Sequence, residues 1–235
     1  TNEVIANLAN VALGGQKGAY TPVHPNDHVN MGQSTNDTIP TAIRLAALAK
    51  LPRLIQTVEA MATAFATLGK QEVNTVKSGR THLQDAVPTT LGREFHAYAF
   101  TLRRCNAQLG ATRALLCDIG LGGSAVGTGL NTAPGYAERA AQELARLTGE
   151  PIKPAADLTA QMQSMGDLQQ LSNALRALAL EVTRIANDMR LLASGPRTGF
   201  AEIVLPAVQP GSSIMPGKVN PVMFEMLNQM CYQVL

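Results

Sequence analysis

Hydrogen-bonding side chains crowd together just before the first long apolar run of the sequence. Ser34, Thr35, Asn36 and Asp37 follow one another, and apolar residues with helical spacing come next. Because the free N–H groups at the start of a helix favour anions, this cluster predicts a cradle for a carboxylate or a phosphate. Capping of the helix by Asp37 or Thr38 is the simpler interpretation, and it explains only one or two of these residues.

A histidine stands among other polar side chains in a second segment, 78–88. His82 directly follows Thr81 and precedes Asp85 by three positions. A neutral imidazole can orient or relay a proton near pH 7, so this segment is a candidate for acid–base chemistry. Arg80 and Asp85 could equally form a local ion pair.

A third segment, 211–221, brackets paired serines with two glycines and continues into Lys218 and Asn220. It superficially resembles a nucleotide-binding P-loop. We reject that motif because five residues separate the glycines and Val219 follows the lysine, where a P-loop needs Ser or Thr. Glycines on both sides predict a mobile loop that closes over a ligand and brings in the lysine and the asparagine as donors.

A fourth stretch, Gly120–Ala125, fits the dinucleotide pattern G-x-G-x-x-A. We expect residues 115–120 to end a helix and not to form the strand that this motif requires. A loop that lines a substrate site and extends through Thr132 is the better interpretation. No H-x-x-E-H, G-x-S-x-G or Asp/His metal motif occurs in the sequence.

Long helices are expected to position these segments. Between positions 168 and 192, apolar residues recur at alternating steps of three and four: Leu168, Leu171, Leu175, Leu178, Val182, Ile185, Met189 and Leu192. A helix with one narrow apolar seam needs partner helices. A second periodic run, 45–68, has Pro40 near its start and contains Pro52, which we expect to kink or break the helix.

Helical patterns also cover 91–116, 134–147 and 221–235, whereas alternating strand patterns are nearly absent. The best strand candidate, 202–208, is interrupted by Pro206. The sequence therefore predicts a mainly α fold in a single region, 1–235. Because the last apolar run reaches Leu235 without a cap or breaker, we expect a partial chain.

Composition narrows the function classes. The chain has 19 Lys and Arg against 17 Asp and Glu, a net charge of +2, and 15% charged residues, which argues against nucleic acid as a partner. No run approaches the roughly 20 apolar residues of a membrane span, which argues against a membrane partner. Three cysteines without a C-x-x-C spacing predict neither a zinc site nor a disulfide framework and favour the cytoplasm.

Two of the polar segments, Gly79–Asp85 and Gly211–Pro221, resemble the signatures of the aspartase/fumarase superfamily, and Gln33–Asp37 resembles a third region in the expected order. Within the superfamily the chain is most similar to the aspartate ammonia-lyase branch, because fumarases usually have Ser where Thr35 stands and differ after Asn220-Pro221. The resemblance implies a long-helix bundle shared within a homotetramer, with active sites shared between subunits. It places the chain at the end of an N-terminal domain running into the central helical bundle, with the C-terminal part absent.

The resemblance also implies the reaction, a reversible anti elimination of ammonia from L-aspartate that gives fumarate through an aci-carboxylate. Ser212 matches the general base, and Glu225 matches the residue that pairs with His82. The matching carboxylate ligands are Ser34, Thr35, Asn36, Thr81, His82, Lys218 and Asn220. His24, Asn26 and Asp27 match a secondary dicarboxylate site of fumarases.

The resemblance implies no required cofactor and no metal site, and the sequence leaves open activation by a divalent metal. Two alternatives to the ammonia-lyase remain. A class II fumarate hydratase would use the same Ser212, Lys218 and His82 on malate. A noncatalytic helical assembly module would have no need for Ser212, Lys218 and Asn220, and their presence argues against it.

Overall fold

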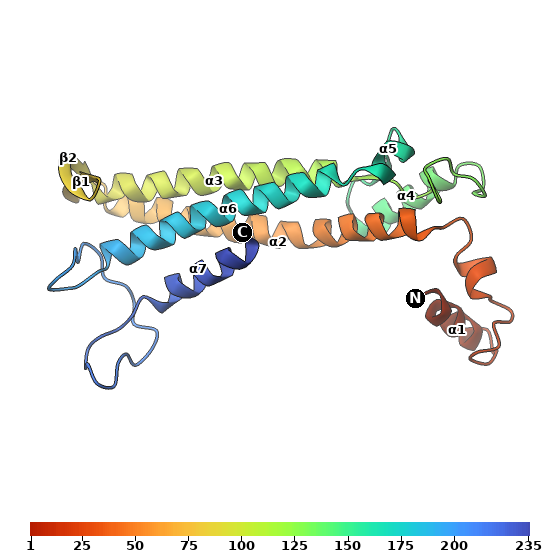
Figure 1. Ribbon diagram of the computed structural model, residues 1–235, viewed down its shortest axis with the longest axis horizontal. Coiled ribbons are helices and arrows are strands. Elements are labelled where there is room, and N and C mark those ends of the chain that lie inside the picture. The colour runs from red at the N-terminus through yellow and green to blue at the C-terminus, as the bar shows by residue number, and fades with distance from the viewer. The chain divides into compact units, whose positions relative to one another are not determined.

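The computed structural model describes residues 1–235, most of which lie in helices (Figure 1). The α-helices are α1 (Asn2–Ala12), α2 (Thr35–Gln71), α3 (Leu91–Leu115), α4 (Tyr136–Thr148), α5 (Leu158–Gln163), α6 (Gly166–Leu192) and α7 (Val222–Val234), with a π-helix η1 (Pro25–Val29). The strands β1 (Val76–Thr81) and β2 (Gln84–Thr90) pair antiparallel, and β3 (Asp118–Ile119) and β4 (Lys153–Pro154) pair parallel. The predicted mainly α fold is confirmed.

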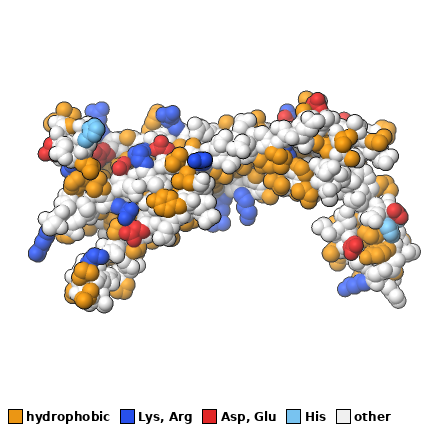
Figure 2. Space-filling model, viewed as in Figure 1, with side chains coloured by type: hydrophobic (Ala, Val, Ile, Leu, Met, Phe, Trp, Pro, Cys, Tyr) orange, Lys and Arg blue, Asp and Glu red, His pale blue; other side chains and the backbone are white.

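The chain divides into two compact units. Unit 1 comprises Thr1–Leu51 and Arg113–Gln169, and unit 2 comprises Pro52–Thr112 and Gln170–Leu235. None of the helices is both long enough and apolar enough to span a membrane. On the face that Figure 2 draws, Lys and Arg side chains are scattered among other types and do not gather into one patch.

Helix α6 confirms the predicted apolar seam between Leu168 and Leu192. Most of the seam is buried, and Ala174, Ala179 and Ala186 beside it are buried as well, so the covered stripe is wider than the seam alone. A buried stripe of this kind packs against partner helices, as the pattern requires. The Tyr98 hydroxyl of α3 lies 3.2 Å from Asp188 Oδ2 of α6.

Aromatic side chains join α2 to α3 within unit 2. The Phe65 ring meets Tyr98 edge-on with centroids 5.4 Å apart, and it lies 6.1 Å from the Phe95 ring. Gly92 allows the start of α3 to approach the end of α2, because a Cβ there would lie 2.5 Å from the Gly69 carbonyl oxygen. These contacts place the hairpin β1–β2 at the shared end of the two helices (Figure 1).

Of the kink or break predicted at Pro52, the break is wrong, because α2 continues without interruption from Thr35 to Gln71. A proline inside a helix removes one backbone hydrogen bond. The flanking residues Leu48, Leu51 and Val58 are all nearly fully buried, so their packing offsets that loss. The helix also begins five residues before Pro40, which lies inside it.

The strand candidate at 202–208, which Pro206 interrupts, does not form a strand. The backbone N–H groups of Ala201 and Glu202 donate to the carbonyls of Ser194 and Leu192 at 2.9 Å each, so this segment folds back on the end of α6. The hairpin occurs instead at 76–90, where sequence analysis predicts a loop. Its mostly polar residues are half-buried or exposed and lack the alternation that marks a half-buried strand.

Candidate active site

The polar cluster before α2 begins the helix through a reciprocal cap. Ser34 Oγ accepts from the Asn36 N–H at 3.2 Å, and Asp37 Oδ1 accepts from the Ser34 N–H at 2.9 Å. This is a capping box, so Ser34 is the N-cap in place of the predicted Asp37 or Thr38. The Thr38 hydroxyl instead donates to the Ser34 carbonyl at 2.7 Å.

A cavity of about 530 Å³ opens beside this cap in unit 1. Three segments line it, which are the start of α2, the Gly-rich loop and the end of α5: Thr35, Asn36, Ile39, Pro40, Ala125, Val126, Met162 and Gln163. The predicted substrate residues Thr35 and Asn36 are thus exposed in one concave site. The Asn36 side-chain amide donates to the Ala125 carbonyl at 3.0 Å and joins two of the segments.

The Gly-rich stretch does not form a dinucleotide site. A two-residue strand, β3, precedes it where sequence analysis expects a helix end, yet no helix opens at Gly120 and the loop runs on to Tyr136. The N–H groups of Gly122 and Ser124 donate to Asp37 Oδ2 at 3.1 and 3.0 Å. The chain's own carboxylate therefore occupies the place where a phosphate would have to bind.

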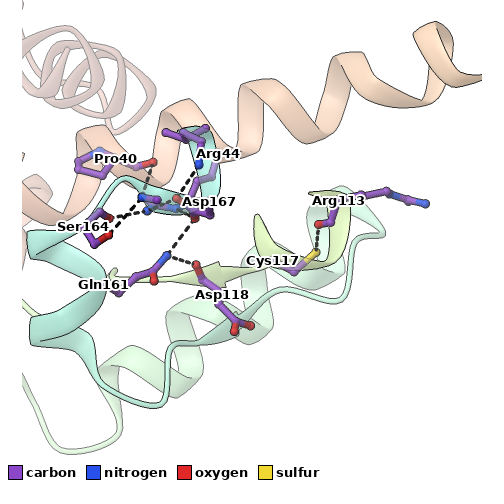
Figure 3. Close-up of polar contacts among 10 residues, drawn as sticks. Pro40, Arg44, Arg113, Cys117, Asp118, Gln161, Ser164 and Asp167 are labelled. Carbon is purple, nitrogen blue, oxygen red and sulfur yellow. Dashed lines mark hydrogen bonds and ion pairs between the residues drawn. The ribbon is translucent and has the colours of Figure 1, made fainter. Parts of the chain in front are cut away.

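A buried ion pair fixes the third wall of this cavity (Figure 3). The Arg44 guanidinium, fully buried on α2, donates to both carboxylate oxygens of Asp167 at 2.6 and 3.0 Å. It also donates to the carbonyls of Pro40 at 3.2 Å and Ser164 at 3.3 Å. The Gln161 amide bridges Asp167 to the backbone of β3. The pair thereby joins the start of α2 to the α5–α6 junction.

In unit 2, Thr81 and His82 lie at the tip of the hairpin β1–β2. His82 and Leu83 have φ values of 54° and 61°, a left-handed backbone at both central turn positions. Glycine and asparagine usually occupy such positions, so the turn is strained. Both the Thr81 and His82 side chains are exposed. The two side chains are therefore accessible at the tip of the hairpin.

The strain yields a stability prediction for the turn. Leu83 is 63% exposed, so Leu83→Gly removes little packing and should raise the free energy of unfolding by about 1 kcal/mol, because glycine adopts a positive φ without cost. Leu130, 75% exposed and without a positive φ, provides the control. Urea unfolding should show Leu130→Gly to be neutral or destabilising, and equal effects of both substitutions would contradict strain at Leu83.

Salt bridges anchor the hairpin to the segment after α6. Glu202 pairs with Arg80 and, at 2.5 Å, with Lys77, while the Arg80 guanidinium lies 4.0 Å above the Phe200 ring. The predicted Arg80–Asp85 ion pair is therefore not made, and Asp85 Oδ1 instead accepts from the Ser78 hydroxyl at 3.0 Å. This network fixes the base of the turn that carries Thr81 and His82.

The network predicts a pH-dependent contribution to stability. Burial disfavours ionised Glu202, but hydrogen bonds from Arg80 and Lys77 outweigh it and lower the pKa of this carboxyl below 4.5. The stabilisation is therefore present above the ordinary glutamate pKa and is lost as the pH falls through the lower folded value. Glu202→Gln should cost about 1–3 kcal/mol at pH 7 and less at pH 3. Urea unfolding at both pH values tests this, and an equal cost at both would contradict it.

The signature loop, 211–221, folds into a small ring. The Ser212 N–H donates to the Lys218 carbonyl at 3.0 Å, and Ser212 Oγ accepts from the Met215 N–H at 3.2 Å. The Lys218 ammonium donates to Asn220 Oδ1 at 2.6 Å, so two predicted substrate ligands are already side by side. The ring requires Gly211, whose φ is 89° and where a Cβ would lie 2.5 Å from the Lys218 carbonyl oxygen.

The structure does not show the predicted pairing of His82 with Glu225. Glu225 on α7 lies 3.7 Å from the Arg190 guanidinium, and no hydrogen bond or ion pair connects it or Ser212 to His82. The His82–Glu225 pairing stays a prediction. Near η1, the His24 imidazole accepts from the N–H groups of Asn26 and Asp27 at 3.2 Å each, so it caps this short helix.

The three cysteines are neither paired with one another nor activated. Cys105, Cys117 and Cys231 are free and buried, and burial raises the pKa of the Cys105 and Cys117 thiols, which keeps them protonated and weakly nucleophilic. No three His, Cys, Asp or Glu side chains lie close enough together to hold a metal ion.

Three groups support the site in ways that sequence analysis does not predict, namely the buried Asp37 carboxylate, which it names only in the polar cluster and as a possible helix cap, the Arg44–Asp167 pair and Glu202. Only the first has a local signal, because Ser34 and Asp37 have the S-x-x-D spacing of a capping box. The partners in the other two are 123 and 122 residues apart, and no short motif reveals contacts at such separations.

Known proteins resemble the whole chain. An aspartate ammonia-lyase from Pseudomonas canavaninivorans is 51% identical over 235 residues, which cover 100% of this chain and 50% of that protein. A class II fumarate hydratase from Ralstonia nicotianae is 48% identical, over 99% of this chain and 51% of the hydratase. The chain spans about half the length of the curated relatives it matches.

Solved structures agree with these relatives. A fumarate lyase:delta crystallin from Brucella melitensis, bound to cobalt, matches with a TM-score of 0.95 and 51% identity over 99% of this chain and 51% of the other. A class II fumarase from Schistosoma mansoni also has a TM-score of 0.95, with 37% identity over 99% of this chain and 52% of the fumarase. The lyase family matches residues 1–235. The chain therefore belongs to the lyase family, in the aspartase/fumarase superfamily that its motifs indicate.

Proposed function

We propose that the protein catalyses the reversible anti elimination of ammonia from L-aspartate, giving fumarate. One observation carries the proposal, which is the 51% identity to an aspartate ammonia-lyase along the whole of this chain. Thr35, where fumarases usually have Ser, supports the same branch. The substrate is a small dicarboxylate.

Ser212 is proposed as the general base. Its oxygen first takes a proton from Cβ, and the electron pair of that C–H bond moves onto the adjacent carboxylate. Return of this pair then forms the Cα–Cβ double bond and breaks the Cα–N bond, so that ammonia leaves. The adjacent carboxylate carries the developing charge as an aci-carboxylate, so dense hydrogen-bond donors must face it. The preassembled Lys218 and Asn220 pair on the same ring supplies such donors. A serine is a poor base in water, so closure of this loop must exclude solvent and activate it.

The remaining site residues are proposed to bind the substrate's carboxylates. Thr81 and His82 at the hairpin tip contribute donors, with Glu225 of the assembled enzyme paired to the imidazole. Thr35 and Asn36 line the unit 1 cavity. Ser34 uses only an acceptor lone pair in its cap, and its O–H stays available to donate.

We further propose a homotetramer in which different subunits complete each active site, with no required cofactor. Two exposed apolar helix faces support burial in an assembly. Val4, Ile5 and Leu8 are exposed on α1, as are Met223 and Met230 on α7. The three free, buried cysteines suit the cytoplasm.

A class II fumarate hydratase is the second candidate, because the Ralstonia nicotianae enzyme is nearly as similar as the ammonia-lyases. Both reactions can use the same base and the same carboxylate ligands. They differ in the leaving group at Cα, ammonia in one case and water in the other.

The proposal is tested with the protein at its full natural length. L-Aspartate and L-malate are supplied separately, and fumarate is followed by its ultraviolet absorbance. Fumarate from aspartate alone supports the ammonia-lyase. Fumarate from malate alone moves the function to the hydratase with the same site residues, and no fumarate from either substrate contradicts both.

A further inference from the structure

The Asp37 carboxylate is fully buried at the third residue of α2, yet no arginine or lysine side chain bonds to it. Its partners are three backbone N–H groups. Oδ1 accepts from Ser34 at 2.9 Å, and Oδ2 accepts from Gly122 at 3.1 Å and Ser124 at 3.0 Å. A buried charge is costly unless it is fully hydrogen-bonded, so this arrangement is specific to a carboxylate.

The two loop N–H groups need that carboxylate in turn. Gly122 and Ser124 have φ values of 97° and 58°, and this left-handed backbone turns their N–H groups toward one point. Such a concave group of N–H donors binds anions. Without an acceptor inside it, the buried donors would be unpaired, at a cost of about 1–3 kcal/mol each.

Asp37 thereby joins two walls of the unit 1 cavity. On one side, its carboxylate holds the capped turn that contains Thr35 and Asn36. On the other side, it holds the loop that continues into Ala125 and Val126. The Asn36 amide donates to Ala125 across the same junction. The relative placement of the two walls therefore depends on one side chain that is itself shielded from the cavity.

We propose that Asp37 is a positioning residue for substrate binding, which holds Thr35 and Asn36 against the Gly-rich loop in the geometry that a substrate carboxylate requires. The proposal rests on the proposed function. Asp37 touches no substrate and takes no proton. Because Thr35 and Asn36 would contact the carboxylate equally in the ground and transition states, disturbing them weakens both alike and raises KM more than it lowers kcat.

The test compares two isosteric substitutions in the full-length enzyme. Asp37→Asn keeps one acceptor oxygen and replaces the other by an NH₂ group, which cannot accept a hydrogen bond. The backbone N–H donors on one of the two cavity walls therefore lose their acceptor. Asn10→Asp is the matched control, since Asn10 is also fully buried in unit 1 and bonds twice to the Val23 backbone at 2.8 Å without lining the cavity. Asp37→Glu, which keeps the charge, separates geometry from charge. KM does not depend on the folded fraction, so it reports on the site even where stability falls.

We expect Asp37→Asn and Asp37→Glu to raise KM for L-aspartate about tenfold or more with a smaller change in kcat, and Asn10→Asp to leave KM within about twofold. An unchanged KM in the Asp37 variants, with only less active enzyme as in Asn10→Asp, would overturn the positioning role and leave the proposed function standing. A wild-type enzyme that makes no fumarate from aspartate overturns the proposed function, and the positioning role with it.

Discussion

Ser212→Ala is expected to lower kcat by a factor of about 10² or more, because it removes the atom that takes the Cβ proton. The structural cost should be small, since the side chain makes one hydrogen bond, from the Met215 N–H at 3.2 Å. Steady-state kinetics with L-aspartate measures the effect. The oligomeric state and the unfolding temperature, recorded on the same samples, show that the fold is retained.

The neighbouring serine provides the control. Ser213 is exposed on the same loop, and Ser213→Ala should retain turnover close to wild type. Near-normal turnover by Ser212→Ala would assign the base elsewhere. An equal loss in both variants would indicate that the loop needs its hydroxyls for shape and not for proton transfer.

Asp167→Ala is expected to lower the free energy of unfolding by about 3–5 kcal/mol, because it leaves the guanidinium of Arg44 buried without a counter-charge. Arg44 is 0% exposed, and Asp167 provides both of its charged contacts. Urea unfolding measures the change. The loss should be larger than that for an exposed pair such as Arg146 and Glu143, where Glu143→Ala should cost less than about 1 kcal/mol.

A double variant separates the charge from the packing. Arg44→Met combined with Asp167→Ala removes both charges and should recover part of the lost stability, since a buried pair replaced by apolar groups is often close to neutral. If the double variant were less stable than Asp167→Ala alone, packing of the arginine side chain would dominate and the stranded charge would not explain the loss.

The sequence predicts the long helices well because their signal is periodic. The apolar seam from Leu168 to Leu192 indicates a helix wherever it is placed, and α6 follows it closely. The helix boundaries depend on individual side chains, whose effects the periodic pattern does not reveal. Ser34 begins α2 five residues earlier than Pro40 suggests, and α2 continues through Pro52 because Leu51 and Val58 are buried on either side.

The hairpin was not predictable in the same way. Its strands are mostly polar without an alternating apolar face, and its turn uses His82 and Leu83 at positive φ where the usual signal is Asn-Gly. Residues that break a local rule and are held by distant contacts are expected at functional sites. The Glu202 network, which comes from far along the chain, makes this turn possible.

The candidate site likewise contains residues that the sequence predicts and residues that it does not. Motifs identify the residues that would touch substrate, such as Ser212, Lys218 and Thr35, because their spacing along the chain is fixed. The side chains that hold these residues in place act across the fold. Asp37 reaches a loop 85 residues away, and no composition or periodicity reveals that contact.

The most direct test of the central claim runs the reaction in reverse. Full-length enzyme is incubated with fumarate and ammonia in D₂O, and the product is examined by proton NMR. The ammonia-lyase account predicts L-aspartate with a single deuterium at Cβ, placed anti to the amino group. Formation of deuterated malate in its place would show that water and not ammonia adds to fumarate, and it would contradict the account.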